Sequence, residues 1–518
     1  MNNFTKKVQI FILIILIIST PSCVFSQSSK LDLEKLDNYI ESSYKSWEIP
    51  GMAIAIVKDN EVVFAKGYGI KEYGKKGQVD ENTLFAIASN TKSFTSASLS
   101  ILVNEGKISW DDKVIDYLPY FEMYNDYVTN EITIRDLLSH HSGLETFSGD
   151  LLWYGTTYTR EEILKRVKFL EPVYGFRSHY GYSNVMYLAA GQIIEAVTGI
   201  KWEDFVQEHF LTPLEMKSSY TSISQFKKGD NIALPHEVEI GEEPIVLKYL
   251  SWDNIAPAGA IISSVSDMSQ WIKLQLNNGI YNGDTILNEE QIWEMRSPQT
   301  ILEIGSWAPK YWASKHFEAY GFGWSLWDYH GKKIVEHGGG ADGMISQTVL
   351  IPEENFGFVI LTNSINYLPS SLMYYILDMY LDENSRDWSE FFLNYFRFNA
   401  EQEKINTKKE EEERDKTTLP SLELSAYCGT YTSELYGNAE VKLEKNSLVV
   451  SLIPTPMFVG DLTHWQDDTF KIQLREIYNL PSGKVNFIID ENKKVTEMKI
   501  DIPNPDFDFT ELKFLKNQ

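Results

Sequence analysis

Ser89 and Lys92 stand three residues apart at the start of a stretch with helical spacing. Positions i and i+3 of a helix share one face, so we expect the Lys92 amine beside the Ser89 hydroxyl, within reach of its proton. A serine next to a proton acceptor is the pairing that activates a nucleophile. The field at a helix N-terminus favours negative charge on Ser89, and burial favours the neutral form of Lys92. The pair predicts covalent catalysis.

The Ser-x-x-Lys spacing is not decisive by itself. It recurs at Ser42 to Lys45 and at Ser224 to Lys227. The alternative interpretation of Ser89 is an ordinary N-cap serine followed by a solvated lysine.

Tyr182-Ser183-Asn184 precedes a second helical stretch, which should end at Gly199. Tyr182 can carry a proton between nucleophile and leaving group, and Asn184 can orient Lys92 and a substrate amide. Ser183 lies in a segment one residue short of a nucleophile elbow, so we assign it no catalytic role. The alternative is an N-capping asparagine beside a core tyrosine.

A run of glycines, His337-Gly338-Gly339-Gly340, follows a predicted strand over residues 332–336. Consecutive glycines at a strand end let a substrate lie along the backbone and can offer it a free N–H. The alternative is a flexible turn with an exposed histidine. The paired histidines His140 and His141 have no further ligand at metal spacing, so we expect neither a metal nor a cofactor. His140 is interpreted as a hydrogen-bonding residue that structures its loop.

The elements that must position these residues can be read from periodicity. A helix is expected over residues 89–105, a hairpin over 52–57 and 62–68, and further strands over 345–351 and 357–363. This order indicates an α/β (α+β) domain in which an antiparallel sheet is flanked by helices.

The C-terminal part of the chain has a different pattern. A charge run over residues 404–416 predicts a solvated helix or linker. After Pro420, short β segments predict a small antiparallel barrel or sandwich; they cover residues 429–433, 439–443, 448–453, 470–474, 485–489, 495–500 and 509–514.

Residues 1–26 have the basic, apolar and small-residue regions of a cleavable signal peptide, which predicts a secreted or periplasmic protein. Lipidation at Cys23 is the alternative. Cleavage before Gln27 would leave Cys428 as the only cysteine and no intrachain disulfide.

The chain is strongly acidic. Its formal charge of −26 becomes −28 once the signal peptide, with Lys6 and Lys7, is removed. Such a charge argues against nucleic acid and anionic membranes as partners. We expect a small-molecule or peptide substrate, and no membrane span after signal removal.

Taken in order, the three motifs resemble those of the serine β-lactamase-like hydrolases, a family that includes class C β-lactamases, DD-peptidases, D-aminopeptidases and esterases. The resemblance covers about residues 31–364. The further matching stretches are Leu137–Leu144, Pro257–Ala260, Tyr320–Trp324 and Leu361–Asn363. The C-terminal part looks like the lipocalin-like β-barrel often appended to such hydrolases.

The residue patterns and the resemblance together divide the chain into four segments, and the resemblance implies a role for each motif residue. The segments are a signal peptide (1–26), a hydrolase domain (27–395), a charged helical linker (396–420) and a β-barrel domain (421–518). Ser89 would form the acyl-enzyme, and Lys92 and Tyr182 would share acid-base work, with the base for acylation left open.

The remaining motif residues would hold the substrate. Asn184, which also supports Lys92, would contact it together with Gly338 and Gly339. The backbone N–H groups of Ser89 and Gly340 would form the oxyanion hole.

His337 departs from the family pattern, because β-lactamases and many DD-peptidases have a lysine there that anchors the substrate carboxylate. A histidine is mostly neutral near pH 7, which weakens that contact. Lys332 or Lys333 on the same strand could compensate. The simpler expectation is a preference for esters, amides or D-amino-acid peptides over β-lactams.

The leading hypothesis is therefore a serine hydrolase. A binding or sensor protein on the same fold, acylated slowly or catalytically silent, is the alternative. Transfer of the acyl group to an amine or alcohol instead of water is a third, because both reactions share the acyl-enzyme.

Overall fold

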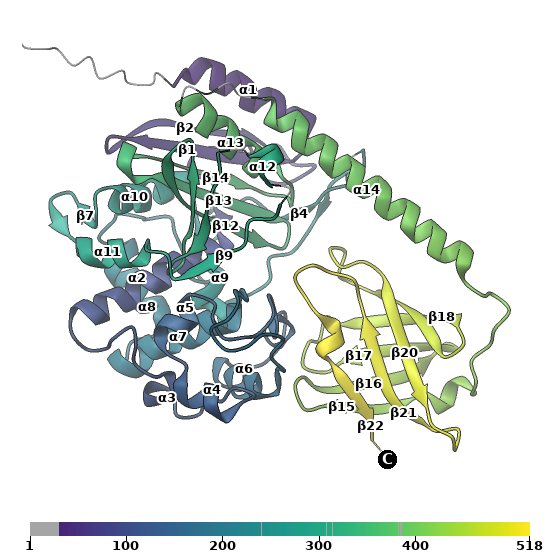
Figure 1. Ribbon diagram of the computed structural model, residues 1–518. Helices are drawn as coiled ribbons and strands as arrows, with labels where there is room; N and C mark the ends of the chain where they lie inside the picture. Colours follow the sequence, from purple (N-terminus) through teal and green to yellow (C-terminus); the bar gives the residue numbers. More distant parts are fainter. Residues whose placement is uncertain are drawn as a thin grey trace, which may run out of the picture.

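A computed structural model describes residues 31–239, 241–306, 308–312, 314–381, 383 and 386–517. The predicted signal peptide, with Cys23, lies outside these residues. Figure 1 shows a helix-covered sheet joined to a helical region, and a separate barrel connected to them by the long helix α14. In the described part of the chain, no helix is long and apolar enough to cross a bilayer.

The first domain is built on an antiparallel sheet, eight-stranded in the part of the chain described, with the order β2-β1-β14-β13-β12-β11-β10-β9. The predicted hairpin is its β1–β2 edge. The strands are β1 (Gly51–Lys58), β2 (Glu61–Gly69), β9 (Thr300–Leu302), β10 (Glu318–Tyr320), β11 (Ser325–Tyr329), β12 (Lys332–Ala341), β13 (Met344–Ile351) and β14 (Phe356–Thr362).

Both faces of this sheet are covered. Along β1, Ile54 and Ile56 pack into one core, and Ala53 and Ala55 pack into the other, since successive strand residues point to opposite faces. Helices α1 (Leu33–Ser46), α13 (Leu368–Tyr380) and the start of α14 (Trp388–Glu413) belong to the first core. Helices α2 (Thr91–Asn104) and α10 (Val265–Leu276) belong to the second.

Helix α2 lies at the centre of the helical region and is buried along most of its length. Phe94 stacks on Trp271 of α10 with ring centroids 3.8 Å apart. The other helices are α3 (Val114–Tyr117), α4 (Asp126–Glu131), α5 (Ile134–Leu138), α6 (Arg160–Arg166), α7 (Asn184–Thr198), α8 (Trp202–Val206), α9 (Ala256–Gly259), α11 (Glu289–Met295) and α12 (Ala308–Tyr311). Short two-stranded pairs join β3 (Phe85–Ala86) to β6 (Ile262–Ser263), β4 (His236–Glu237) to β5 (Ile245–Val246) and β7 (Ile280–Tyr281) to β8 (Asp284–Thr285).

Three local expectations differ from the structure. The strand expected over residues 509–514 is a 3-10 turn, Phe509–Glu511, followed by the last strand of the barrel, β22 (Lys513–Lys516). The helix expected from Ser89 begins instead with a 3-10 turn, Ala88–Asn90, and becomes α-helical at Thr91. Strand β12 does not stop at residue 336 but continues through the glycine run to Ala341, because it keeps pairing with β13 as far as Met344. The turn between them is made by Asp342 and Gly343, and Gly343 has a φ of 66°.

The C-terminal part is a closed barrel within residues 429–516, all of which are described. Its strands are β15 (Gly429–Ser433), β16 (Gly437–Glu444), β17 (Ser447–Leu452), β18 (Val459–Gln466), β19 (Thr469–Leu474), β20 (Gly483–Ile489), β21 (Val495–Asp501) and β22 (Lys513–Lys516). The predicted combination of an antiparallel sheet flanked by helices and a small antiparallel barrel is confirmed, and the barrel excludes the sandwich alternative.

The barrel docks on the helical region. Tyr158 Oη donates to the carbonyl of Tyr436 at 2.6 Å, and Thr157 N donates to the carbonyl of Pro454 at 2.9 Å. The Glu511 carboxylate accepts from Gly149 N at 3.0 Å and from the Ser148 hydroxyl. These contacts come from three barrel loops, which lie between β15 and β16, between β17 and β18, and between β21 and β22. They hold the barrel against the helical region.

Candidate active site

Ser89 lies in the 3-10 turn that links the short strand β3 to α2. Ser346 of β13 fixes this turn to the sheet, because its Oγ donates to the carbonyl of Ile87 at 2.6 Å and accepts from Asn90 Nδ2 at 2.8 Å. The nucleophile candidate is thus held against the sheet by a side chain that carries no motif of its own.

Lys92 is completely buried beside Ser89. Its Nζ lies 3.0 Å from Ser89 Oγ, 2.7 Å from Asn184 Oδ1 and 2.9 Å from the carbonyl of Ala258. A neutral amine has two N–H groups and one lone pair. With the N–H groups donated to Asn184 and Ala258, the lone pair is left for the Ser89 hydroxyl.

The surroundings favour that neutral form. Burial lowers the pKa of Lys92 to about 7, although the Asp150 carboxylate acts in the opposite direction. Asp150 is also buried, which raises its pKa to about 7, and it accepts from Asn184 Nδ2 at 2.6 Å. Asn184 therefore bridges the lysine and the aspartate and fixes both.

Tyr182 lies over the same lysine, with Lys92 Nζ 4.7 Å from its ring centroid. Burial raises the pKa of Tyr182 far above its usual range, and the hydrogen bond between Tyr182 and Ser89 opposes this only in part. A phenol that stays protonated can donate a proton to a leaving group, whereas a neutral Lys92 can accept one.

His140 fixes the backbone on both sides of Tyr182. Its carbonyl accepts from Gly181 N and its Nδ1 accepts from Ser183 N, each at 3.0 Å. Burial lowers the pKa of His140 well below its usual value, which keeps the ring neutral and Nδ1 able to accept. The interpretation of His140 as a loop-structuring residue agrees with this geometry.

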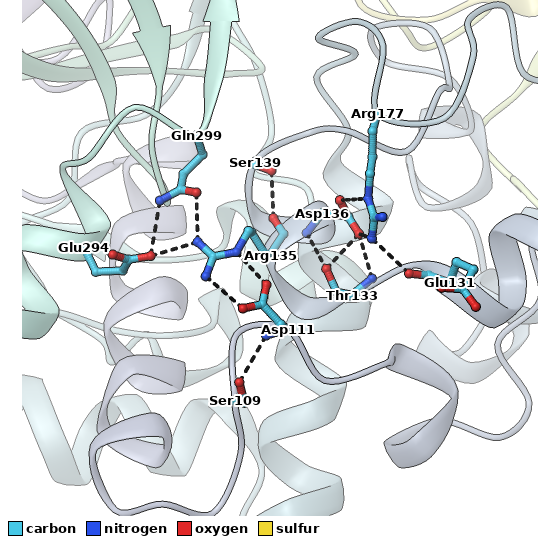
Figure 2. Close-up of polar contacts among 10 residues, drawn as sticks. All are labelled: Ser109, Asp111, Glu131, Thr133, Arg135, Asp136, Ser139, Arg177, Glu294 and Gln299. Atoms are coloured by element: carbon cyan, nitrogen blue, oxygen red, sulfur yellow. Dashed lines mark hydrogen bonds and ion pairs between the residues drawn. The ribbon is translucent and has the colours of Figure 1, made fainter.

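The loop that carries His140 is anchored by the charged network drawn in Figure 2. Thr133 and Asp136 form a capping box at the start of α5, and Arg177 donates to both Asp136 carboxylate oxygens, at 2.8 and 2.7 Å. On the other side of the helix, Arg135 pairs with Asp111 and Glu294.

His337 is buried and neutral. Burial lowers its pKa to about 3, with the nearby Lys92 as a second cause. Its Nε2 lies 2.9 Å from Tyr320 Oη and its Nδ1 2.5 Å from the carbonyl of Gly338. Lys332 pairs with Glu354 and Lys333 donates to the carbonyl of Arg296, so neither lysine compensates for the missing charge.

The glycine run presents a free strand edge to Ser89. Strand β11 pairs with β12 only as far as Glu336, so the edge beyond it is left open. Gly339 lies so close to the nucleophile turn that a Cβ would sit 2.3 Å from the carbonyl of Ile87 and 3.0 Å from Ser89 N. Gly338 and Gly340 line the cavity. The structure thus brings together every predicted site residue around one point.

These groups open into a cavity of about 440 Å³. Its first-domain wall includes Asp150, Trp153, Trp252 and Asp342, and its barrel wall consists of Asn479, Leu480, Asn504, Asp506 and Phe507. In the described residues, no group of three or more potential ligands could hold a metal ion.

Sequence reasoning missed several of these residues. Asp150 and Ser346 belong to no motif, and Tyr320 and Ala258 were noted only within matching stretches. One sequence feature could have indicated the barrel residues. In Pro503-Asn504-Pro505-Asp506, the two prolines fix their φ angles and make the segment rigid. Loops that a rigid scaffold positions often carry binding residues.

Comparison with known proteins identifies the class. Residues 36–371 match the family described as Beta-lactamase, and residues 413–516 match a domain of unknown function (DUF3471). The first match covers more than half of the chain, and the protein belongs to the β-lactamase family of serine hydrolases. This confirms the resemblance inferred from the three motifs.

Individual relatives support the same class. The chain is 28% identical over 452 residues to Unguisins hydrolase ungD of Aspergillus violaceofuscus (strain CBS 115571), covering 81% of this chain and 78% of that protein. The octameric penicillin-binding protein homologue from Pyrococcus abyssi has a TM-score of 0.61 at 23% identity, covering 94% of this chain and 100% of that one. A D-amino acid amidase from Ochrobactrum anthropi SV3, complexed with L-phenylalanine amide, has a TM-score of 0.55 at 22% identity, covering 67% and 98%. The two structures show the fold alone.

Proposed function

We propose that Ser89 is an acyl-enzyme nucleophile that cleaves an ester, an amide or a D-amino-acid peptide bond. The observation that carries the proposal is the buried Lys92, with Nζ 3.0 Å from Ser89 Oγ and a pKa of about 7. An amine that is half deprotonated at neutral pH and faces a serine hydroxyl can act as general base.

In acylation, the Lys92 amine accepts the Ser89 proton while Oγ attacks the substrate carbonyl. The backbone N–H groups of Ser89 and Gly340 stabilise the oxyanion, a contribution of about 3 kcal/mol per donor in comparable sites. Tyr182 donates its proton to the leaving group and regains one from Lys92. In deacylation, water attacks the acyl carbonyl, its proton passes to Lys92, and Ser89 recovers a proton as the acid leaves.

The third motif supports the proposed substrate class. His337 is neutral and its ring nitrogens are occupied by Tyr320 and Gly338, so the site offers no charged anchor there for a β-lactam carboxylate. Esters, amides and D-amino-acid peptides fit this chemistry better. The fold shared with a D-amino acid amidase agrees with this choice.

A secreted or periplasmic location is part of the proposal, and its support is the composition of residues 1–26. Intact-mass analysis of protein exported from its host should give a chain that begins at Gln27. A diacylated chain that begins at Cys23 would favour lipidation instead.

The nucleophile is tested with a fluorophosphonate probe, intact-mass spectrometry and turnover of p-nitrophenyl esters. Wild-type protein should gain one label and hydrolyse the ester, and Ser89→Ala should do neither. Ser183→Ala is the matched control, because Ser183 is buried beside Tyr182 and its Oγ has no hydrogen-bond partner among the described residues.

Labelling that persists in Ser89→Ala would refute the assignment, and labelling without turnover would favour the sensor alternative. A catalytic efficiency on cephalosporins equal to that on amides would contradict the substrate class.

A further inference from the structure

We propose that the C-terminal barrel supplies part of the substrate site, in which Asp506 together with Asp342 binds a protonated amine. The preferred substrates then carry a free α-ammonium group on the acyl side of the scissile bond. The inference rests on the proposed function and deepens it, because it names what the acyl group must carry.

Two barrel loops form one wall of the Ser89 cavity. The loop between β19 and β20 contributes Asn479, and the loop after β21 contributes Asp506 and Phe507. Asn504 holds the second loop in shape, since its Oδ1 accepts from the backbone N–H of Asp506 at 2.8 Å and of Phe507 at 3.1 Å. Asp506 is thus presented to the cavity by a fixed turn.

Asp342 reaches the same space from the turn after β12. Its Oδ1 accepts from Tyr154 Oη at 2.7 Å and from Asn479 Nδ2 at 2.6 Å, so the barrel orients this carboxylate. Its Oδ2 is buried and has no hydrogen-bond partner among the described residues. A buried carboxylate oxygen without a donor is costly, and a bound ligand that donates a hydrogen bond would remove that cost.

The cavity is acidic and lacks a matching cation. Asp150, Asp342 and Asp506 all line it, and among the described lining residues none is lysine or arginine. Asp506 remains accessible, and its carboxylate has no hydrogen bond or ion pair with the described residues. Partial burial raises the pKa of both Asp342 and Asp506, which an ammonium partner would reverse. Asp150 Oδ1 is also buried without a partner, but Asp150 Oδ2 accepts from Asn184 beside Lys92. Asp342, which bonds Asn479 of the barrel, and Asp506 of the barrel are the two cavity carboxylates at the barrel wall.

The position along β12 sets where the amine must be. Asp342 stands two residues after Gly340, the expected oxyanion donor, in the turn that follows β12, so it lies no more than about 7 Å from that residue. The α-nitrogen of the attacked residue, together with an ammonium–carboxylate hydrogen bond of about 2.8 Å, bridges that distance. At the opposite end of the glycine run, His337 is neutral and offers no charge to a substrate group. A substrate antiparallel to β12 therefore places its amino end at the acidic side.

The same wall selects an apolar side chain next to the amine. Trp153 packs against Trp252 at 5.0 Å and against Phe507 at 6.3 Å between ring centroids, and all three line the cavity. Such rings suit an aromatic or aliphatic side chain and also attract a nearby ammonium. The inferred substrate is an amino-terminal apolar aminoacyl group.

The test compares three chromogenic p-nitroanilides in both D and L series: phenylalanyl with a free amine, its N-acetyl derivative, and the phenyllactyl analogue in which hydroxyl replaces ammonium. Wild-type protein should favour the free amine by at least tenfold in kcat/KM over both neutral forms. Asp506→Asn should reduce that ratio at least tenfold. Asp506→Lys should reverse it and favour an N-succinyl substrate.

The matched control is Asp501→Asn, an exposed aspartate on β21 of the same barrel that should leave the ratio unchanged. Thermal melting and fluorophosphonate labelling check that each variant is folded. Equal wild-type rates on the free and the acetylated amine would overturn the amine subsite. If ester turnover is still lost in Ser89→Ala, the hydrolase assignment remains supported. Absence of both labelling and turnover in wild-type protein would overturn both.

Discussion

At the scale of single residues, Lys92 and Asp150 are both bound to Asn184, and each affects the pKa of the other. Burial favours the neutral form of each group, while the charge of each favours the charged form of the other. Since Asp150 carries negative charge when ionised, it raises the pKa of Lys92, and its removal must lower that pKa.

This arrangement predicts the pH dependence of the reaction. With a neutral ester, kcat/KM should rise with pH through a midpoint near 7, because only deprotonated Lys92 accepts the Ser89 proton. Asp150→Asn should move this midpoint to lower pH. Asp116→Asn, at an exposed position of α3, is the control and should leave it in place. A midpoint that rises in Asp150→Asn would contradict the coupling.

Gly339 provides a steric prediction. An alanine Cβ there would sit 2.3 Å from the carbonyl of Ile87 and 2.4 Å from Ser346 Oγ, so β12 must move away from the Ser89 turn. Gly339→Ala should slow fluorophosphonate labelling at least a hundredfold and lower the melting temperature.

The comparison variant is Gly340→Ala, whose Cβ meets only Ile345 Cδ1 at 3.7 Å. It should melt like the wild type. Equal melting temperatures and labelling rates for the two alanine variants would show that the close approach of Gly339 has no consequence.

At the scale of elements, α5 connects the charged network of Figure 2 to the backbone around Tyr182. Asp136 is nearly buried, with 5% of its side chain exposed, whereas the Arg177 side chain that binds it is 44% exposed. If Arg177 is removed, water can therefore replace part of the hydrogen bonding that it donates to the Asp136 carboxylate.

Arg177→Gln should lower the free energy of unfolding by about 1 to 2 kcal/mol, since a nearly buried carboxylate loses a bidentate charged partner. Chemical denaturation measures this change. Lys45→Gln removes an exposed pair with Glu41 and should lower the free energy of unfolding much less than Arg177→Gln does. A similar cost for both variants would mean that the network is no stronger than a surface ion pair.

Helices and strands with strong periodicity could be predicted from the sequence. The bounds of the other strands depend on which neighbouring strand pairs with them. The hairpin edge of the sheet, α2 and most barrel strands follow from local patterns. Strand β12 continues through three glycines because β13 pairs with it, and β18 was missed because Gly460 and Asp461 interrupt its apolar alternation. The three motifs indicated the chemistry, but Asp150 and the barrel wall depend on distant contacts that no local pattern contains.

At the scale of the whole molecule, we expect the docked barrel to limit how large a substrate can be, because two of its loops form one wall of the Ser89 cavity. Glu511→Ala removes the acceptor for Gly149 N and the Ser148 hydroxyl, so the barrel loops should be held less firmly over the cavity. We expect cleavage of a hexapeptide amide relative to a dipeptide amide to increase at least threefold. Glu491→Ala, at an exposed barrel position, is the control. An unchanged ratio would mean that the docking does not limit length.

Helix α14 gives the docked barrel a further property. Only its beginning is buried against the first domain, and its 26 residues extend about 39 Å toward the barrel (Figure 1). This covalent tether makes docking of the barrel an intramolecular event, so the barrel is present at a far higher effective concentration than a separate chain would be. An interface too weak to join two separate chains can thus stay closed here. With the proposed amine subsite, substitutions in the barrel loops would alter substrate recognition while the residues around Ser89 stay unchanged, so that specificity and chemistry could evolve separately.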